Sequence, residues 1–131
     1  MLIGVPRETW TGESRSALVP SNAKRLLAAG FEVEIEAGLG ISSGFSDEEY
    51  VEVGAKIISD RSDLLSRSDV VLRVRQPDIE EIHFLKEGSL HLSFLDPFNE
   101  RELVDALAAQ GVTAVSMEMI PRSTRAQKMD A

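Results

Sequence analysis

Short apolar runs recur along the chain, and polar stretches with helical spacing separate them. Residues 69–74 contain four apolar side chains, three of them consecutive, which predicts a buried strand. Residues 31–36 instead alternate apolar and acidic side chains, a pattern that predicts a strand with one exposed, acidic face. The same reasoning predicts four further strands, at residues 2–5, 56–58, 90–94 and 112–117.

Capping signals and apolar residues three or four apart predict helices between these strands. One helix opens at Pro20 and Ser21 and stops at Gly30. Ser46 and Glu49 form a capping box that opens the next helix. Three further helices follow: residues 60–67 behind a Ser59 or Asp60 cap, residues 78–85, and a helix from an Asn99–Glu102 capping box to Gly111.

Alternating strands and helices predict a single α/β domain, with a mainly parallel sheet and helices on both of its faces. The 131 residues suit one core, and the 43% hydrophobic content excludes a disordered chain. A net charge of −8 disfavours nucleic acid or an anionic membrane as a partner. We expect a cytoplasmic protein, because residues 1–6 fit a strand rather than a signal peptide and no apolar run reaches the ~20 residues of a membrane span.

Four arginines lie in or after predicted strands, where ligands of α/β folds gather. They are Arg7, Arg15, Arg73 and Arg75. Guanidinium groups bind carboxylates and phosphates through paired hydrogen bonds, so these side chains are candidates for an anion site. For any single arginine, a surface ion pair with one of the 22 acidic residues is the favoured alternative.

The glycine-rich segment 38–44 superficially resembles a dinucleotide-binding loop. Its spacing is G-x-G-x-x-x-G, whereas the fingerprint is G-x-G-x-x-G opening directly into a helix. Phe45 and a new cap at Ser46 also intervene before the next helix. A structural turn is therefore the favoured interpretation.

A polar cluster at residues 119–131 follows the last predicted strand. Its side chains suit either a ligand site or an ordinary capped helix start. His83 and His91 have no histidine or carboxylate at metal-binding spacing, which favours surface or sheet-packing roles and predicts no metal site. The chain contains no cysteine, which excludes disulfides and thiolate chemistry.

Several segments together resemble the alanine dehydrogenase and pyridine nucleotide transhydrogenase family. They are MLIGVPRE (1–8), ESRSALVP (13–20), AGLG (37–40), GFSDEEY (44–50) and VVLRVRQP (70–77). The resemblance covers essentially the whole chain. It implies a flavodoxin-like, Rossmann-like three-layer N-terminal domain without the GxGxxG fingerprint, spanning residues 1–131, with the NAD-binding Rossmann domain downstream.

The two branches of this family differ at particular positions. The alanine dehydrogenase branch has an arginine and a lysine on the 2-oxo acid, where this chain has Arg15 and Arg75, and a catalytic histidine, where this chain has Asp96. The terminal segment PRSTRAQKMD resembles the transhydrogenase alpha subunit, in which Arg, Gln and Asp surround the nicotinamide of NAD(H). Carried over by position, those residues are Arg122, Gln127 and Asp130.

The resemblance thus implies an oxidoreductase domain that transfers hydride between NAD(H) and NADP(H), the latter held by a partner domain. It further implies a homodimer, NADP-binding and membrane subunits as partners, proton translocation, and a location peripheral to the inner membrane through those subunits. The isolated chain is expected to be inactive. Two alternatives stay open: a substrate domain of an amino-acid dehydrogenase that uses Arg15 and Arg75, and a non-catalytic binding or assembly module.

Overall fold

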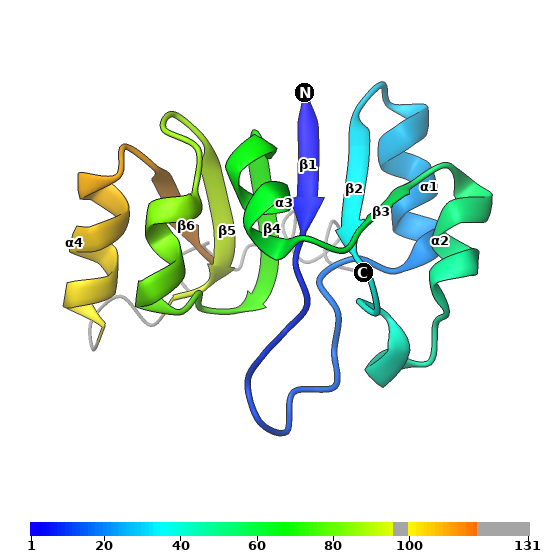
Figure 1. The fold of residues 1–131 in the computed structure, drawn as a ribbon, viewed down its shortest axis with the longest axis horizontal. Coiled ribbons are helices and arrows are strands. Elements are labelled where there is room, and N and C mark those ends of the chain that lie inside the picture. The colour runs from blue at the N-terminus through cyan, green and yellow to red at the C-terminus, as the bar shows by residue number, and fades with distance from the viewer. Residues whose placement is uncertain (96–99, 118–131) are drawn as a thin grey trace, which may run out of the picture.

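The computed structural model describes residues 1–95 and 100–117. Six strands form one sheet, and every pairing between neighbouring strands is parallel. The strands are β1 (Leu2–Val5), β2 (Glu32–Glu36), β3 (Lys56–Ile58), β4 (Val70–Arg75), β5 (Leu90–Phe94) and β6 (Thr113–Ser116). Their spatial order is β3-β2-β1-β4-β5-β6 (Figure 1). The predicted α/β class is confirmed, and the order is that of the doubly wound Rossmann sheet.

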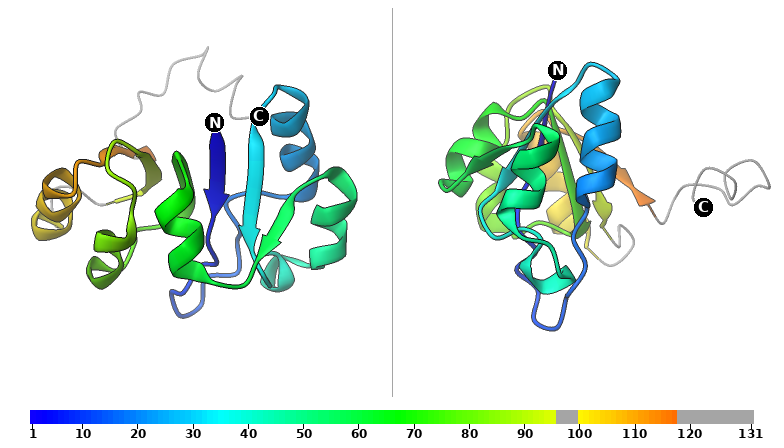
Figure 2. Two further views of the ribbon diagram at one scale, coloured as in Figure 1. Left: turned by 45° about the horizontal axis from the view of Figure 1, so that its top comes forward. Right: turned by 90° about the vertical axis from the view of Figure 1, so that its right-hand side faces the viewer.

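Helices cover the two faces of the sheet from different parts of the chain. The helices are α1 (Pro20–Ala28), α2 (Asp47–Val53), α3 (Arg61–Arg67) and α4 (Arg101–Ala109), with 3₁₀ segments η1 (Ile41–Ser43) and η2 (Ile79–Phe84). Buried residues of β1 and β2 form one core cluster with Ala23 of α1 and Tyr50 of α2. Val71 of β4 belongs to a second cluster with Leu65 of α3 and Leu107 of α4. The edge-on view of Figure 2 shows α1 on one side of the sheet and α3 on the other.

The helix caps agree closely with the sequence pattern. Ser46 and Glu49 form the predicted capping box of α2, and Asp60 accepts hydrogen bonds from the amides at the start of α3. Two predictions need adjustment. The segment predicted as a helix at 78–85 is 3₁₀, and α4 begins at Arg101 behind Glu100 rather than behind Asn99, which lies outside the described residues.

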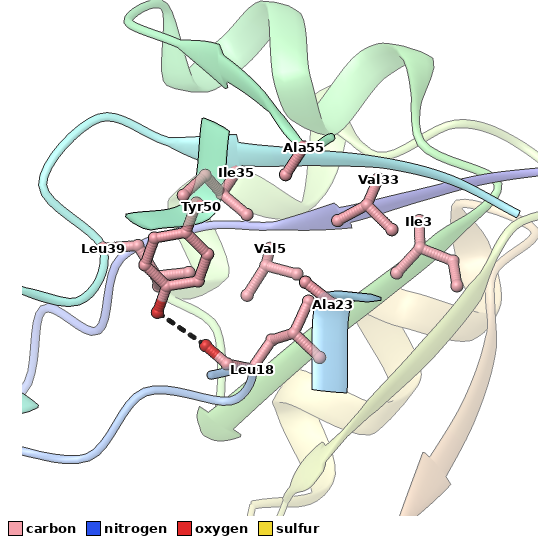
Figure 3. Packing of buried hydrophobic residues seen from close by; sticks show 9 residues of the cluster. All are labelled: Ile3, Val5, Leu18, Ala23, Val33, Ile35, Leu39, Tyr50 and Ala55. Atoms are coloured by element: carbon pink, nitrogen blue, oxygen red, sulfur yellow. Dashed lines mark hydrogen bonds between the residues drawn. The ribbon is translucent and has the colours of Figure 1, made fainter. Parts of the chain in front are cut away.

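A buried tyrosine of α2 completes the first core cluster. Tyr50 is fully buried, and its hydroxyl donates a 2.8 Å hydrogen bond to the carbonyl oxygen of Leu18 (Figure 3). Leu18 lies just before α1, so this bond ties α2 to the entrance of α1. Burial raises the pKa of the Tyr50 phenol, which keeps it in the form that donates this bond.

The prediction of an exposed acidic face on β2 is correct for Glu32 but wrong for Glu34, which is buried. Glu34 is buried, because α3 passes over this face on its way from β3 to β4. Arg67 donates a 2.9 Å hydrogen bond from Nη1 to Oε2 of Glu34, and Arg61 forms an ion pair with Glu36. The alternating acidic pattern therefore marks a face covered by basic side chains rather than by water.

A buried polar cluster lies on the same face of the sheet, farther along. Leu90, Leu92 and Phe94 share one face of β5, which turns His91 and Ser93 toward the opposite, buried side. The His91 ring is 1% exposed, and its Nε2 lies 3.2 Å from Oγ of Ser93. Burial, followed by the nearby positive charge of Arg73, lowers the pKa of His91 to about 3.

Arg73 itself is an unusual interior residue. Its side chain is 1% exposed, and its Nη1 lies 3.6 Å from Oε1 of Glu81 on η2. Its Nε and Nη2 have no hydrogen-bond partner among the described residues. Burial lowers the pKa of the Arg73 guanidinium from its ordinary value. The cluster thus holds a cation and a neutral imidazole in a poorly hydrated space.

Replacing Tyr50 by Phe should lower the free energy of unfolding by about 1–3 kcal/mol, because the buried Leu18 carbonyl then loses its donor. Urea unfolding of the chain provides the measurement. The neighbouring exposed variant Glu52→Gln is the matched control and should leave stability unchanged. Equal stability of the Y50F and wild-type chains would contradict this account.

Acidification should destabilise the fold through His91. In the unfolded chain His91 binds a proton below pH 6.5, whereas in the folded chain its ring stays neutral down to about pH 3. The free energy of unfolding therefore falls over this window, by up to about 1.4 kcal/mol per pH unit from this residue. Urea unfolding at a series of pH values should show a shallower slope in His91→Gln and an unchanged slope in the control His83→Gln. Identical slopes in His91→Gln and wild type would refute the assignment.

Candidate functional site

The chain reverses its direction of winding between β1 and β4. From β1 it proceeds outward through β2 and β3, and it then returns to β4 on the other side of β1. Ligand sites of doubly wound folds lie beyond the carboxyl ends of the strands at such a switch point. In Figure 1 the long loop after β1 (dark blue, at the bottom) extends past these strand ends. This loop, residues 6–16, carries two of the four candidate arginines, Arg7 and Arg15.

Glu8 anchors the loop to the end of β4. β1 pairs with β4 only at Ile3 and Gly4, so the last amides of β4 need another partner. The Glu8 carboxylate accepts hydrogen bonds from the amides of Val74 (Oε2, 2.9 Å) and Arg75 (Oε1, 2.8 Å). An acidic side chain thus takes the place of a neighbouring strand at the switch point.

Glu13 brings two of the predicted anion-binding arginines together. Arg15 donates from Nε to Oε2 and from Nη2 to Oε1 of Glu13, each at 2.9 Å. Arg75 donates from Nε to Oε1 of Glu13, also at 2.9 Å. The Glu13 side chain is only 4% exposed, and the hydrogen bonds from Arg15 lower the pKa of its carboxyl to about 2. The arginines do form a carboxylate clamp, but the carboxylate they hold belongs to the chain itself.

Trp10 contacts Arg75, one of the two arginines of this clamp. Its indole Nε1 donates a 3.2 Å hydrogen bond to the carbonyl oxygen of Gln76, and the Arg75 guanidinium carbon lies 5.4 Å from the ring centroid. Trp10 is 42% exposed, so it does not pack in the core. A cation–π contact and one hydrogen bond hold the ring in the open instead.

The four candidate arginines do not converge on one point. Arg7 and Arg15 line a cavity of about 160 Å³ together with Glu8 and Glu13. Arg73 is buried, and its Nη1 approaches Oε1 of Glu81 on η2 instead. The cavity therefore balances two cations against two anions. This balance gives it no strong preference for an added negative charge.

The glycine segment 38–44 is a structural turn, as the spacing predicts. The amide of Gly38 donates to Oδ1 of Asp47 at 2.9 Å, and other amides of the segment donate to carbonyls within it. A side chain at Gly40 would place its Cβ 2.8 Å from a ring carbon of Tyr50, so packing against the tyrosine requires glycine there. With its amides engaged and an acidic helix start beside it, this segment does not fit a dinucleotide pyrophosphate.

The residues predicted to contact a nicotinamide lie outside the described part of the structure. These are Arg122, Gln127 and Asp130, together with Asp96 in the position expected for a catalytic histidine. Conversely, Glu8 and Glu13 are site residues that the sequence analysis missed. In the sequence, each of these glutamates is distinguished only by a nearby loop arginine, and such pairs are common on protein surfaces.

Within residues 1–95 and 100–117, no helix is long and apolar enough to cross a bilayer. The same residues contain no group of three or more histidine, aspartate or glutamate side chains placed to hold a metal ion.

A doubly wound α/β domain with a polar site at its switch point is the class that these observations define. The sequence model described as alanine dehydrogenase/PNT, N-terminal domain, matches residues 4–131. The chain therefore belongs to this family.

Similar proteins come from both branches of the family. The NAD(P) transhydrogenase subunit alpha of Cereibacter sphaeroides is 40% identical over 131 residues, which cover all of this chain and 25% of that protein. The alanine dehydrogenase of Bacillus subtilis is 37% identical over 120 residues, which cover 92% of this chain and 32% of that protein. A solved transhydrogenase structure from Sinorhizobium meliloti superposes with a TM-score of 0.93 at 35% identity, covering 99% of this chain and 39% of its own. The chain spans well under half the length of each of these relatives.

Glu13 should remain ionised down to a pH of about 2, because the clamp stabilises its charged form. Since its folded pKa lies below the ordinary value of 4.5, its contribution to stability is complete above pH 4.5 and disappears as the pH falls toward 2. Carboxyl-carbon NMR titration of the wild-type chain and its variants would measure this.

Arg15→Gln should raise the pKa of Glu13 more than Arg75→Gln does, because Arg15 makes the larger contribution. A wild-type Glu13 that titrates near 4.5 would show that the clamp does not form in solution.

Proposed function

We propose that this chain is the N-terminal domain of an NAD(P) transhydrogenase alpha subunit and helps to form the NAD(H) site. In this proposal, hydride passes directly between NAD(H) and NADP(H) held by a partner domain. The 40% identity to the Cereibacter sphaeroides subunit along the whole chain supports it, as does the close superposition on the Sinorhizobium meliloti transhydrogenase.

The observation that carries the proposal is the clamp on Glu13. An amino-acid dehydrogenase must hold the carboxylate of its substrate, and Arg15 and Arg75 are the side chains placed to do so. Both are bound to Glu13 instead, through three charge-assisted hydrogen bonds. A substrate carboxylate would therefore have to displace an internal carboxylate that already occupies both arginines. Hydride exchange between two nicotinamides needs no such carboxylate site.

The proton chemistry supports the same conclusion. Oxidation of an amino acid requires an acid/base group in the pocket, whereas transfer between two nicotinamide rings requires positioning and exclusion of water. Asp96 stands where the dehydrogenase branch has its histidine. His91 cannot replace it, because its ring is sealed beside Ser93 on the face of β5 that packs against the helices.

In the proposed site, the terminal residues orient the nicotinamide end of NAD(H). Gln127 offers a donor and an acceptor to the carboxamide, and Arg122 donates to the carboxamide or to a pyrophosphate oxygen. Asp130 orients these two side chains. The bound nicotinamide supplies the hydride chemistry. Since segment 38–44 offers no pyrophosphate cradle, the pyrophosphate belongs to a downstream Rossmann domain.

The remaining parts of the proposal concern the assembly. The chain covers 25% of the Cereibacter sphaeroides subunit, so further domains are expected. We propose a homodimer that associates with NADP-binding and membrane subunits. Coupling of hydride transfer to proton translocation would then reside in those subunits.

A second candidate is the substrate domain of an alanine dehydrogenase-like enzyme. The 37% identity to the Bacillus subtilis alanine dehydrogenase favours it, as does the proximity of Arg15 and Arg75. In this alternative, a 2-oxo acid would displace Glu13 from the clamp. Activity with alanine and NAD would support this candidate over the first.

In the intact protein, Arg122→Ala or Gln127→Ala should slow hydride transfer while leaving thermal stability unchanged. Loss of one orienting hydrogen bond should cost about 1–3 kcal/mol, much of it in the rate of the chemical step. Single-turnover transfer from a reduced to an oxidised nicotinamide provides the measurement. Asp130→Asn should have a milder effect, because Asp130 acts through its neighbours.

Arg125→Ala is the matched control, because it removes the same charge from the same segment without touching an assigned residue. Wild-type rates in both R122A and Q127A would contradict this role and support the alternative that the segment is a charged helix start. Equal slowing in R125A would indicate a general charge effect rather than orientation of the ring.

A further inference from the structure

A second cavity, of about 220 Å³, lies between the loop after β1, the segment that follows β4 and the start of α4. All three segments lie at the carboxyl end of the sheet, from which the long dark blue loop extends in Figure 1. Trp10 comes from this loop, Asp78 and Ile79 follow β4, and Leu103 belongs to the first turn of α4. Every residue that lines the cavity belongs to the described part of the chain. We call it the Trp10 cavity.

The apolar part of the Trp10 cavity combines exposed walls with a buried floor. Trp10 is 42% exposed and Ile79 is 44% exposed, whereas Leu103 is buried. The indole is held in place by its hydrogen bond to the carbonyl oxygen of Gln76 and by its contact with the Arg75 guanidinium. A ring that is already fixed loses little conformational freedom when a partner binds, and tryptophan is enriched among the residues that dominate protein interfaces.

The charged part of the Trp10 cavity is entirely acidic. Asp78, Glu100 and Glu102 line it, and no basic side chain does. Within residues 1–95 and 100–117, these three carboxylates take part in no ion pair and no side-chain hydrogen bond. The cavity at Arg7 and Arg15 is different, because cations and anions balance there. The Trp10 cavity therefore attracts a positive charge.

A tryptophan ring beside three carboxylates matches a guanidinium group. Guanidinium ions stack on aromatic rings and pair with carboxylates, and Arg75 already does both, with Trp10 and Glu13. A volume of about 220 Å³ lies below the ~300–1,000 Å³ of sites that enclose a whole small molecule, so it suits one long side chain better. The carboxylates and the net charge of −8 repel nucleic acids and anionic membranes.

We propose that the Trp10 cavity is a docking site for an arginine side chain presented by a partner protein. The partner's guanidinium lies against the indole and pairs with the three carboxylates, and an apolar residue next to it contacts Ile79. The site places a bound partner beside the switch point. It does not rest on the proposed function, because it holds neither a substrate nor a cofactor.

The only tryptophan of the chain reports on binding directly, because it forms a wall of the cavity. The probe is a short peptide of alternating leucine and arginine residues, titrated into the 131-residue chain while Trp10 fluorescence is recorded. We expect a saturable change, and an affinity that falls as salt is added. The same peptide with citrulline in place of arginine keeps the shape but lacks the charge, and it should bind at least about tenfold more weakly.

Removal of the carboxylates should have a similar effect. We expect binding of the arginine peptide to weaken at least about tenfold in the triple variant D78N/E100Q/E102Q. The matched control removes the same charge from three exposed side chains outside the cavity and should weaken binding by less than about twofold. It is the triple variant E32Q/E48Q/E52Q. Circular dichroism verifies folding, and the single variants replace a triple variant that does not fold.

The ring is tested by calorimetry, because its substitution removes the fluorescent reporter. Trp10→Ala should weaken binding of the arginine peptide more than Trp10→Phe does, because phenylalanine keeps an aromatic face for the guanidinium. Equal affinity in W10A and wild type would overturn the proposal.

Equal binding of the arginine and citrulline peptides, or equal weakening in the two triple variants, would also overturn it. The same holds if the chain dimerises in analytical ultracentrifugation and D78N/E100Q/E102Q abolishes the dimer, because a second copy would then be the occupant. None of these measurements requires hydride transfer. Their outcome is therefore independent of whether the proposed function is correct.

Discussion

The passage of α3 across β1 is the constraint on which the rest of the structure depends. The connection from β3 to β4 must cross over the middle of the sheet, and it does so in contact with Gly4. A Cβ at that position would lie 1.8 Å from Oγ of Ser68, so only a glycine lets the crossover approach this closely. The crossover then sets β4 beside β1 and creates the switch point. It also carries Arg61 and Arg67 onto Glu36 and Glu34.

Charge in this acidic protein is arranged so that arginines meet carboxylates from distant segments. Arg61 contacts both Glu36 and Glu81, and it also donates to the backbone carbonyl of Arg7 at 2.9 Å. Arg15 and Arg75 enclose Glu13 in the same way, also beyond the carboxyl ends of the strands. The switch point is consequently stiff and close to neutral. Such a surface is poorly suited to capturing a free anion.

Two surfaces of the domain thus have opposite physical character. At the switch point, the polar side chains of Glu8, Glu13, Arg15 and Arg75 have hydrogen-bond partners within the chain. On the half of the sheet formed by β4, β5 and β6, Leu72, Leu92 and Val115 form an apolar row that is only partly buried.

The sequence by itself determined the elements and the class of fold. Strands follow from apolar runs, and the Ser46 and Asp60 caps follow from hydrogen bonds between residues two or three apart, which any short window of sequence contains. The resemblance in the motifs around Arg15 and Arg75 also identified the family, which the matched residues 4–131 bear out. Tertiary structure alone decided the partners. Glu34 and Arg67 are 33 residues apart, and Glu13 and Arg75 are 62 apart. An acidic stripe faces either water or a helix, and two arginines are either free or paired, depending on which distant segment the crossover places next to them. The local sequence pattern does not contain this information.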